Sequence, residues 1–563
     1  MQSKSKLFLI ILCILFATAF SKQTFAKSEK KADKPTKVEK TEKATNRVAS
    51  SPTVIHSIKN DTTTIPLREM KPVPFPEKEE EAELEHGRNL PMPKALNSVA
   101  GHAKDPSFKD PVVSRKSELQ PTTPSPFESF EGSPNGCGCF PPDTNGDVGP
   151  NNYVQTVNAQ YQVWDKSGTS LLGPININTI WSGFGGDCQT HNNGDPIVLY
   201  DHLADRWMIS QFAINFGGGA QGHQCIAIST SGDPTGTWNR YDFQIGNNVL
   251  NDYPHFGVWP DAYYMTTNQF DPATFGWKGA GELAFERDEM LQGNPAQMVY
   301  FQSFPVNQCF GGMLPSDLDG APPAAGTPNY YLEMDDDTFD CPSGSNDNVK
   351  IWEFHVDWTT PGNSTFGLSG QPNVLLDTAP FDSNLCGYSG NCMKQPNTNT
   401  GLDPLSDRLM HRVQYRTFGS YATLVLSHTV DANGADRGGI RWYEFRKTPP
   451  LVGGSQWSIF QQGTWSPDSD SRFVPSAAMD SAGNIAVGYS VSSTTTFPSI
   501  RYAARLATDP LGDLSQGETE LIAGTGSQTG VDSNNRGRWG DYASMSVDQT
   551  GGSQGGTDCD FWL

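Results

Sequence analysis

The sequence predicts an all-β fold, a β-propeller of four-stranded antiparallel blades, over residues 135–563. Three observations support this prediction. The stretch is rich in Gly, Asn, Asp and aromatic residues and nearly lacks long helical patterns. A strand–turn–strand pattern recurs seven times, and a second hairpin follows each of the first six copies. Repeated units of four strands are typical of propeller blades. We expect seven blades; six or eight blades, or two β-sandwich domains, are the alternatives.

Each copy of the first hairpin is a strand, a polar turn and a strand rich in aromatic or β-branched residues. The second hairpins begin near Tyr161, Cys225, Leu283, Val349, Ile440 and Ile500. The first hairpins cover Asp147–Val157, Gly194–Phe212, His255–Asn268, Ser316–Met334, Arg408–Ser427, Arg472–Tyr489 and Arg538–Trp562.

The seventh copy ends where its second hairpin is due. Either the N-terminal region supplies the missing strands or the gene product is truncated. Val54–Ile58 and Thr62–Pro66 are the candidate donor segments. Without a donor, the last blade would keep an open sheet edge, which favours unwanted association.

The N-terminal region differs from the rest in composition. Lys4 and Lys6 precede an apolar run, Leu7–Phe20, which predicts a signal peptide over residues 1–26. We therefore expect a secreted protein, extracellular or periplasmic, with no membrane span. Residues 27–134 are charged and proline-rich, and we expect them to form a disordered tether or a propeptide.

Charge and cysteine content narrow the partners. A formal net charge of -22 argues against nucleic acid and anionic membranes; the oligomeric state is not indicated. Ten cysteines in an exported chain predict disulfides. A zinc site is disfavoured, because the Cys-Gly-Cys motif has no second ligand pair. The expected pairs are Cys188–Cys225, Cys309–Cys341, Cys386–Cys392, and Cys559 with Cys137 or Cys139.

Three of the predicted innermost strands begin with arginine: Arg408, Arg472 and Arg538. If they converge on a central channel, their guanidinium groups would form a clamp for a carboxylate. Asp195 and Asp317 lie at the corresponding places of earlier copies and could act as general acids. Alternatively, each arginine pairs with a neighbouring blade, or the alignment is shifted by one residue.

Further candidates extend this site. Tyr542 is a catalytic candidate. Trp277 and Trp465, expected in loops, could stack on sugar rings. The ligand-binding candidates are therefore His255, Arg412, Asp541, Trp277 and Trp465.

The segment 143–149 resembles the first half of a calcium-binding loop. Asp143, Asn145 and Asp147 place oxygen atoms at alternate positions, and Gly146 would allow a tight turn. The closing glutamate is missing, since Val154 takes its place. Calcium would need further ligands, for which residues 335–337 are one source; the alternative is an Asx turn. No other cofactor is indicated.

One segment carries a family resemblance. Ser231–Trp238 is similar to the Asp-box turn of sialidases and related propellers, with Gly236 one place late. The resemblance implies a propeller and, for a sialidase, an arginine triad, a Tyr–Glu nucleophile pair and an acidic aspartate. An Arg-Ile-Pro start motif is lacking. The blades also resemble a group of exported bacterial β-propeller proteins that share phrases such as Pro142–Gly149, from which no activity can be transferred.

These observations leave three functions. We rank first an exported propeller that binds extracellular ligands, carbohydrate above all, because no complete catalytic set is present. The second is a sialidase-like glycoside hydrolase that uses the arginine cluster. The third is a structural or adhesive surface protein.

Overall fold

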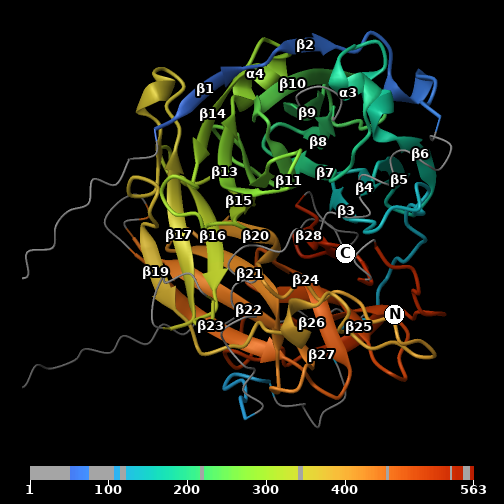
Figure 1. Ribbon diagram of the computed structural model, residues 1–563, viewed down its shortest axis with the longest axis vertical. Coiled ribbons are helices and arrows are strands. Elements are labelled where there is room, and N and C mark those ends of the chain that lie inside the picture. The colour runs from blue at the N-terminus through green and yellow to red at the C-terminus, as the bar shows by residue number, and fades with distance from the viewer. Residues whose placement is uncertain are drawn as a thin grey trace, which may run out of the picture. The chain divides into compact units, whose positions relative to one another are not determined.

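The computed structural model describes residues 51–74, 107–114, 122–215, 221–339, 346–449, 451, 456–532, 536–549 and 558–563. The predicted signal peptide lies outside these residues. No helix in the described ranges is long and apolar enough to cross a membrane. Nearly all of the regular structure consists of antiparallel strands, which are grouped into blades around a ring (Figure 1).

The strands follow the predicted order of two hairpins per blade. Blade one consists of β3 (Asn145–Val148), β4 (Asn152–Val157), β5 (Gln160–Asp165) and β6 (Ser170–Asn176). Blade two consists of β7 (Ile197–Asp201), β8 (Arg206–Ile214), β9 (Gln221–Ser229) and β10 (Trp238–Asn247). Blade three consists of β11 (Leu250–Val258), β12 (Tyr263–Phe270), β13 (Trp277–Phe285) and β14 (Gln297–Gln302). Blade four consists of β15 (Leu314–Asp319), β16 (Asn329–Asp335) and β17 (Asn348–His355), and both β18 (Thr365–Phe366) and β19 (Val374–Asp377) pair with β17. Blade five consists of β20 (Met410–Thr417), β21 (Ala422–Asp431), β22 (Gly438–Lys447) and β23 (Trp457–Trp465), and blade six of β24 (Ser471–Met479), β25 (Ile485–Ser492), β26 (Ser499–Arg505) and β27 (Gly517–Ile522). Blade seven consists of β28 (Ser546–Val547) and β29 (Phe561–Trp562). The helical segments are η1 (Leu67–Glu69), η2 (Ile177–Trp181), α3 (Asp187–Thr190), α4 (Arg287–Gln292), η3 (Pro361–Asn363) and η4 (Cys386–Tyr388).

The innermost strands close into one ring. Strands β3, β7, β11, β15, β20, β24 and β28 are neighbours in chain order, and β28 lies against β3. The propeller with seven blades is confirmed, and the two-sandwich alternative is wrong. Every predicted first hairpin contributes the first two strands of its blade, and every second hairpin contributes the third strand.

Hydrogen bonds between side chain and backbone join the innermost strands around the ring. Blades four and five are joined instead by parallel pairing of β15 with β20. At the other junctions, the side-chain bonds satisfy backbone N–H groups that have no strand partner on the side facing the axis. The acceptor side chains and donor N–H groups are Asn145 and Val198, Asp195 and Tyr253, Asp317 and Val258, Gln414 and Met479, Ser476 and Met545, and Ser544 and Gly146.

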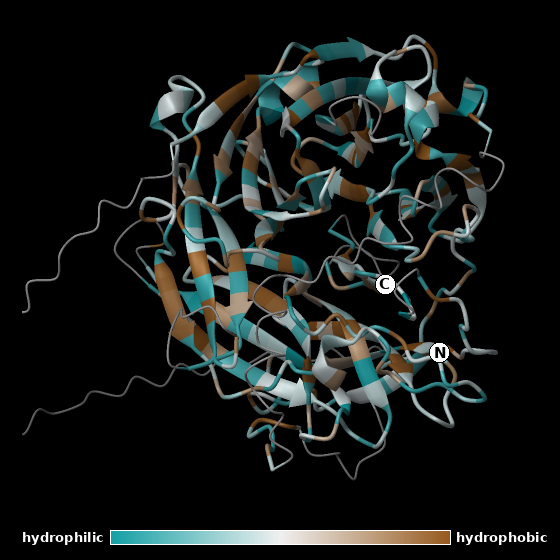
Figure 2. Cartoon of the chain, in the orientation of Figure 1, coloured by the Kyte–Doolittle hydropathy of each residue, from teal (hydrophilic) through white to brown (hydrophobic). Residues whose placement is uncertain are grey.

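Apolar side chains pack between adjacent sheets. Hydrophobic and hydrophilic stretches alternate along the strands (Figure 2), as expected where strands present alternate faces to a neighbour. Trp352 of blade four, for example, lies in one cluster with Tyr264 of blade three and Tyr443 of blade five. Burial on both faces of each blade therefore holds the ring together.

The seventh blade has only two short strands. Trp562 of β29 stacks on Tyr153 of blade one with 5.4 Å between ring centroids. Phe130 lies beside the same rings, 5.9 Å from Trp164 and 6.4 Å from Trp562. An aromatic cluster thus joins the end of the described chain to its first blade.

The prediction that an N-terminal segment completes blade seven is wrong for the two candidate donor segments. Strand β1 (Thr53–His56) pairs with β14 of blade three, and β2 (Lys59–Thr62) pairs with β10 of blade two. Each is a fifth, outermost strand. The complete blades offer long outer edges with unpaired backbone groups, whereas the two-residue strands of blade seven offer almost none.

Other parts of the expected tether also dock on outer edges. Val113 pairs with Thr464 of β23 in blade five. The N–H groups of Thr122 and Thr123 donate to the carbonyl of Gln516 beside β27 in blade six. We call residues 51–74, 107–114 and 122–134 the belt, because together they contact the rim of several blades (Figure 1).

The disulfides agree with the sequence in two of four cases. Cys188 bonds to Cys225, and Cys386 bonds to Cys392, as predicted. Cys309 is also disulfide-bonded, and its predicted partner Cys341 lies outside the described residues. The expected link from Cys559 is wrong, because Cys137 and Cys139 bond to each other. Aromatic packing of Trp562 makes the contact for which that disulfide was invoked.

Candidate functional site at the mouth of the ring

Side chains from three non-adjacent blades fill the middle of the axis. The ring of His255 (blade three) lies 5.1 Å from that of His411 (blade five) and 5.0 Å from that of Tyr542 (blade seven). All three are buried. Blades three, five and seven can meet only on the axis, so the axis is closed at this depth.

The end of the axis where the innermost strands finish is also occupied. Arg416 of blade five pairs with Asp558 at 2.6 Å, and Gln549 donates to Asp319 of blade four at 2.7 Å. Closer to the middle, Arg412 bridges Asp317, at 2.5 Å, and Asp319. The C-terminal residues therefore cover this end.

The opposite end, where the innermost strands begin, carries half-buried carboxylates from three blades. We call this end the mouth and define it by Asp195, Asp252 and Asp541. Asp195 is hydrogen-bonded to Asp252 and accepts the backbone N–H of Tyr253 at 3.0 Å. Burial, and then the charges of Asp252 and Asp541, hold the pKa of Asp195 well above its usual range. A raised pKa favours the protonated form of a carboxyl group, which can act as a hydrogen-bond donor or general acid.

Beneath the carboxylates lies a layer of polar groups that lack protein partners. Neither ring nitrogen of His255 has a hydrogen-bond partner, nor does the hydroxyl of Tyr542. Burial, and then His411 and Arg408, hold the pKa of His255 well below its usual value. Burial, and then Arg412, lower the pKa of His411 to about 3. Both imidazoles are therefore neutral at physiological pH.

The backbone is irregular at this same end. The innermost strands of blades three, five and six each have a register shift there, between Asp252 and His255, Met410 and Gln414, and Phe473 and Ser476. Asp195 and Tyr253 adopt left-handed backbone conformations, with φ of 44° and 56°. Bulges and left-handed non-glycine residues turn side chains out of the strand alternation and gather at functional sites. Here they direct side chains toward the axis.

Two of the three predicted arginines lie at the mouth, and both are paired. Arg408 donates to Asp407 from Nε at 2.7 Å and from Nη2 at 3.0 Å, and Arg538 donates to Asp541. Acidic groups outnumber arginines there. The neighbouring carboxyl groups are those of Asp143, Asp195, Asp252, Asp403, Asp407 and Asp541.

Arg472 does not reach the mouth. It is fully buried within blade six, where it pairs with Asp468 at 2.6 Å and Glu518 of β27 at 2.9 Å. The arginine clamp expected from the sequence therefore does not form as a set of three. The physical reason is that carboxylates of the chain itself, some distant in sequence, already occupy these guanidinium groups.

The remaining predicted catalytic and binding residues lie in different places. His255, Tyr542 and Asp541 lie at or below the mouth, whereas Asp317 and Arg412 form a buried pair deeper on the axis. Trp465 is buried at the end of β23, and Trp277 begins β13 and packs 5.2 Å from Phe270. The expectation of loop tryptophans was wrong, and the buried Trp465 cannot stack on a ligand.

The predicted calcium segment lies on an innermost strand. Asn145 accepts the N–H of Val198, and Asp147 that of Tyr200, both at 2.7 Å. Gly146 lies within strand β3 and does not form the expected tight turn; a Cβ there would collide with the Tyr153 hydroxyl. Asp143 accepts the N–H of Asp541 at 2.8 Å. Calcium binding by Asp143, Asn145 and Asp147 stays a prediction, with the effect of a chelator on Tm as its test.

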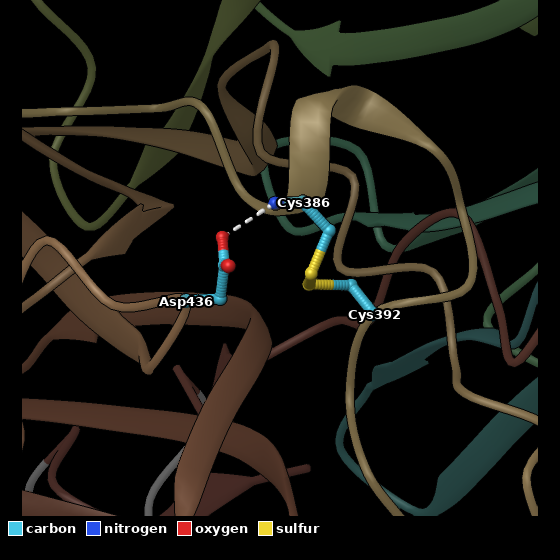
Figure 3. Close-up of side chains that lie close together, drawn as sticks. All are labelled: Cys386, Cys392 and Asp436. Atoms are coloured by element: carbon cyan, nitrogen blue, oxygen red, sulfur yellow. Dashed lines mark hydrogen bonds between the residues drawn. A yellow bond between two sulfur atoms is a disulfide. The ribbon is translucent and has the colours of Figure 1, made fainter. Parts of the chain in front are cut away.

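A disulfide-linked loop shapes the rim of the mouth. Cys386 and Cys392 lie before β20, and the N–H of Cys386 donates to Asp436 at 2.7 Å (Figure 3). Leu402 then bridges to Met393 and Gly537. These contacts fix the segment that carries Asp403 and Asp407. Because both sulfurs are in the disulfide, this trio is not a thiolate metal site.

Two cavities bear on ligand binding. One of ≈ 30 Å³ lies at the mouth and is lined by residues 403–408, Tyr388 and Arg536; it has room for about two water molecules. The other, of ≈ 510 Å³, lies between the belt and blade two, with Asp61, Lys71 and Arg240 in its wall. Asp61 and Arg240 already bind each other at 2.8 Å. We centre the candidate site on the mouth because carboxyl groups from three blades converge there above the buried polar groups of His255 and Tyr542.

His411 is not among the residues predicted from the sequence, although the sequence contains a signal for it. His255 stands three residues after Asp252, and His411 stands three residues after Arg408. Both pairs occupy the same place in their repeats. A recurrent histidine at the start of an innermost strand would have predicted their contact on the axis.

No protein-family model matches the chain, and neither does any curated protein. Three solved structures illustrate the structural likeness. A GH43 endo-arabinanase from Bacillus licheniformis is 14% identical, and the match covers 57% of this chain and 97% of that chain with a TM-score of 0.26. An α-L-arabinanase from Cellvibrio cellulosa complexed with arabinohexaose is 9% identical, and the match covers 57% of this chain and 95% of that chain with a TM-score of 0.23. An ulvan lyase of family PL25 is 12% identical, and the match covers 82% of this chain and 96% of that chain with a TM-score of 0.30. At such values, we transfer neither activity nor residue roles from them.

Proposed function

We propose that this protein is an exported β-propeller that binds carbohydrate outside the cytoplasm, at the mouth of its ring. The observation that carries the proposal is the convergence of Asp195, Asp252 and Asp541, half-buried, above a layer of buried polar groups. Half-buried carboxylates accept hydrogen bonds from sugar hydroxyls with little loss of side-chain freedom. The disulfides favour an oxidising compartment.

The charge of the mouth suggests which sugars it takes. The carboxyl groups there outnumber the guanidinium groups, and Arg408 and Arg538 are held by Asp407 and Asp541. A ligand carboxylate would have to displace these partners and approach an acidic surface. We therefore propose neutral or amino sugars, rather than sialic or uronic acids.

Glycoside hydrolysis is the second candidate function. The raised pKa of Asp195, next to Asp252, favours it, because a glycosidase needs one protonated and one ionised carboxyl group. In this reading Asp195 donates the proton and Asp252 or Asp541 acts as base or nucleophile. The sialidase-like version is weaker, since Arg472 lies away from the mouth.

The test is an incubation of the purified chain with neutral, amino-sugar, uronic-acid and sialylated glycans. Retained glycan and glycan mass are read in the same assay. We expect neutral or amino sugars to be retained. Asp195→Asn should weaken retention about two- to tenfold, because the loss of one hydrogen bond of a neutral carboxyl group costs about 0.5–1.5 kcal/mol. Asp288→Asn, at a position with 78% exposed side chain on α4, is the matched control.

Each outcome decides between functions. Shortened glycans, together with loss of shortening in Asp195→Asn and Asp252→Asn, would establish the hydrolase. Preferential retention of acidic glycans, or an Asp195→Asn variant that binds like the wild type, would overturn the proposed site. No retention of any glycan would favour a structural or adhesive role.

A further inference from the structure

A buried lysine lies among carboxyl groups between blades three and four, far from the mouth. Lys350 Nζ is 2.5 Å from Asp335 Oδ2 and 3.6 Å from Glu333 Oε1. The side chains are 3%, 2% and 1% exposed, respectively. Strands β16 and β17 fix the arrangement, because Glu333 is directly opposite Lys350 and Asp335 is one pair further along the same face.

The surroundings are dry and contain more acid than base. The ring of Phe310 lies 5.3 Å from the ammonium nitrogen. Glu282 of β13 is buried close to Glu333, and burial above all holds its pKa well above the usual range. One amine thus faces several carboxyl groups where charge is poorly solvated.

A proton transfer across the hydrogen bond from Lys350 to Asp335 gives the amine and the carboxylic acid that amide formation joins. Fixed contact in the fold replaces the bimolecular encounter and raises the effective concentration by orders of magnitude. A second carboxyl group, that of Glu333 at 3.6 Å from the nitrogen, can move the protons. We propose that Lys350 and Asp335 are joined by an intramolecular amide bond, formed with Glu333 as the proton carrier.

The reaction balances without an oxidant or cofactor. The Nζ lone pair forms a bond to Asp335 Cγ. One oxygen of the Asp335 carboxyl group leaves as water. Glu333 accepts a proton from the nitrogen and donates one to the departing oxygen, so it ends as it began. The product links β16 to β17 and removes the charges of a buried ion pair, whose desolvation otherwise costs stability.

Peptide mapping of the purified, reduced full chain tests the proposal. Arg287 and Lys394 are the basic residues that flank Lys350 in sequence. With the amide present, trypsin cannot cut after Lys350, and the peptide 288–394 is lighter than its sequence by one water. A second cut after Phe339 then leaves two chains that stay joined. Lys447, also buried but 3.5 Å from its nearest carboxylate, is the internal control and should be cut.

Variants separate chemistry from folding. Glu333→Gln keeps both reactants and should lose the link while remaining folded by circular dichroism. Asp335→Asn should keep the link, now with loss of ammonia. Lys350→Arg should lose it. Complete cleavage after Lys350 in the wild type would overturn the proposal and leave an ordinary buried ion pair. A link that persists in Glu333→Gln would overturn the role of Glu333.

Discussion

Asp110 and Arg441 form an ion pair at 2.8 Å, although they are 331 positions apart in sequence, and neither side chain is exposed. The pair joins the belt to β22 of blade five. Thr464 donates to the same carboxylate at 2.6 Å. A charged, proline-rich segment thus supplies one of the most buried polar contacts of the propeller.

Removing this carboxylate should destabilise the protein strongly. Asp110→Ala leaves the guanidinium of Arg441 buried without its partner, so we expect the free energy of unfolding to fall by about 3–5 kcal/mol. Denaturant unfolding checks it. Glu128→Ala, at an exposed position of the belt, is the control and should change stability by about 0.5 kcal/mol or less. Equal effects of the two changes would show that the belt is not part of the cooperative fold.

Arg472 should matter for stability and not for ligand binding. Arg472→Ala leaves Glu518 largely buried without its main partner, and we expect a loss of about 3–5 kcal/mol. Arg68→Ala breaks a pair whose side chains are 48% and 49% exposed, and should cost about 0–1 kcal/mol. Both are measured by urea unfolding. A stable Arg472→Ala protein with lost glycan retention would instead return this arginine to the site.

The junction between blades seven and one can be tested at Ser544. Its hydroxyl accepts the N–H of Gly146 at 2.7 Å in a buried place. Ser544→Ala leaves this N–H without an acceptor, which costs about 1–3 kcal/mol. Thermal unfolding should show a lower Tm, whereas Ser420→Ala, on an exposed turn, should leave Tm unchanged. An unaltered Tm in Ser544→Ala would mean that the ring does not depend on this bond.

The buried histidines predict a loss of stability in acid. The folded His411 has a pKa of about 3, against 6.5 for an ordinary imidazole. Between these values the unfolded chain binds one more proton, so stability falls as pH falls from 6.5 toward 3. The slope is about 1.4 kcal/mol per pH unit for such a group.

The His411→Gln variant isolates this contribution. The difference in unfolding free energy between wild type and variant should shrink steadily as the pH is lowered from 7 to 4. Ser420→Ala, on an exposed turn, removes no titratable group and should give a constant difference. A constant difference for His411→Gln as well would contradict a buried, neutral imidazole.

The blades were predictable because each hairpin is local. Alternating strands and tight turns of a few residues, such as Tyr200 to Trp207, carry their own signal in sequence. The course of the belt was not predictable, because four-residue strands such as β1 gain their stability only from an edge formed much later in the chain.

The site was predicted in part for a related reason. The repeats indicated that Asp195, His255 and Tyr542 begin or precede innermost strands, and these residues do gather at or below the mouth. The arginines are neutralised by carboxylates near them in sequence, such as Asp407 for Arg408, and also by distant ones, such as Glu518 for Arg472. A repeat alignment contains no information about such pairs.

The belt also has a consequence for how the protein folds. Its residues are synthesised before any blade, yet they contact β14, β10, β23 and β27, the last strands of their blades. Contacts between residues far apart in sequence slow folding, because the entropy of closing a long loop is lost before the contacts stabilise the chain. The belt therefore stays unpaired until the outer strands that it contacts have folded. The propeller can therefore become a single cooperative unit only when nearly the whole chain has emerged.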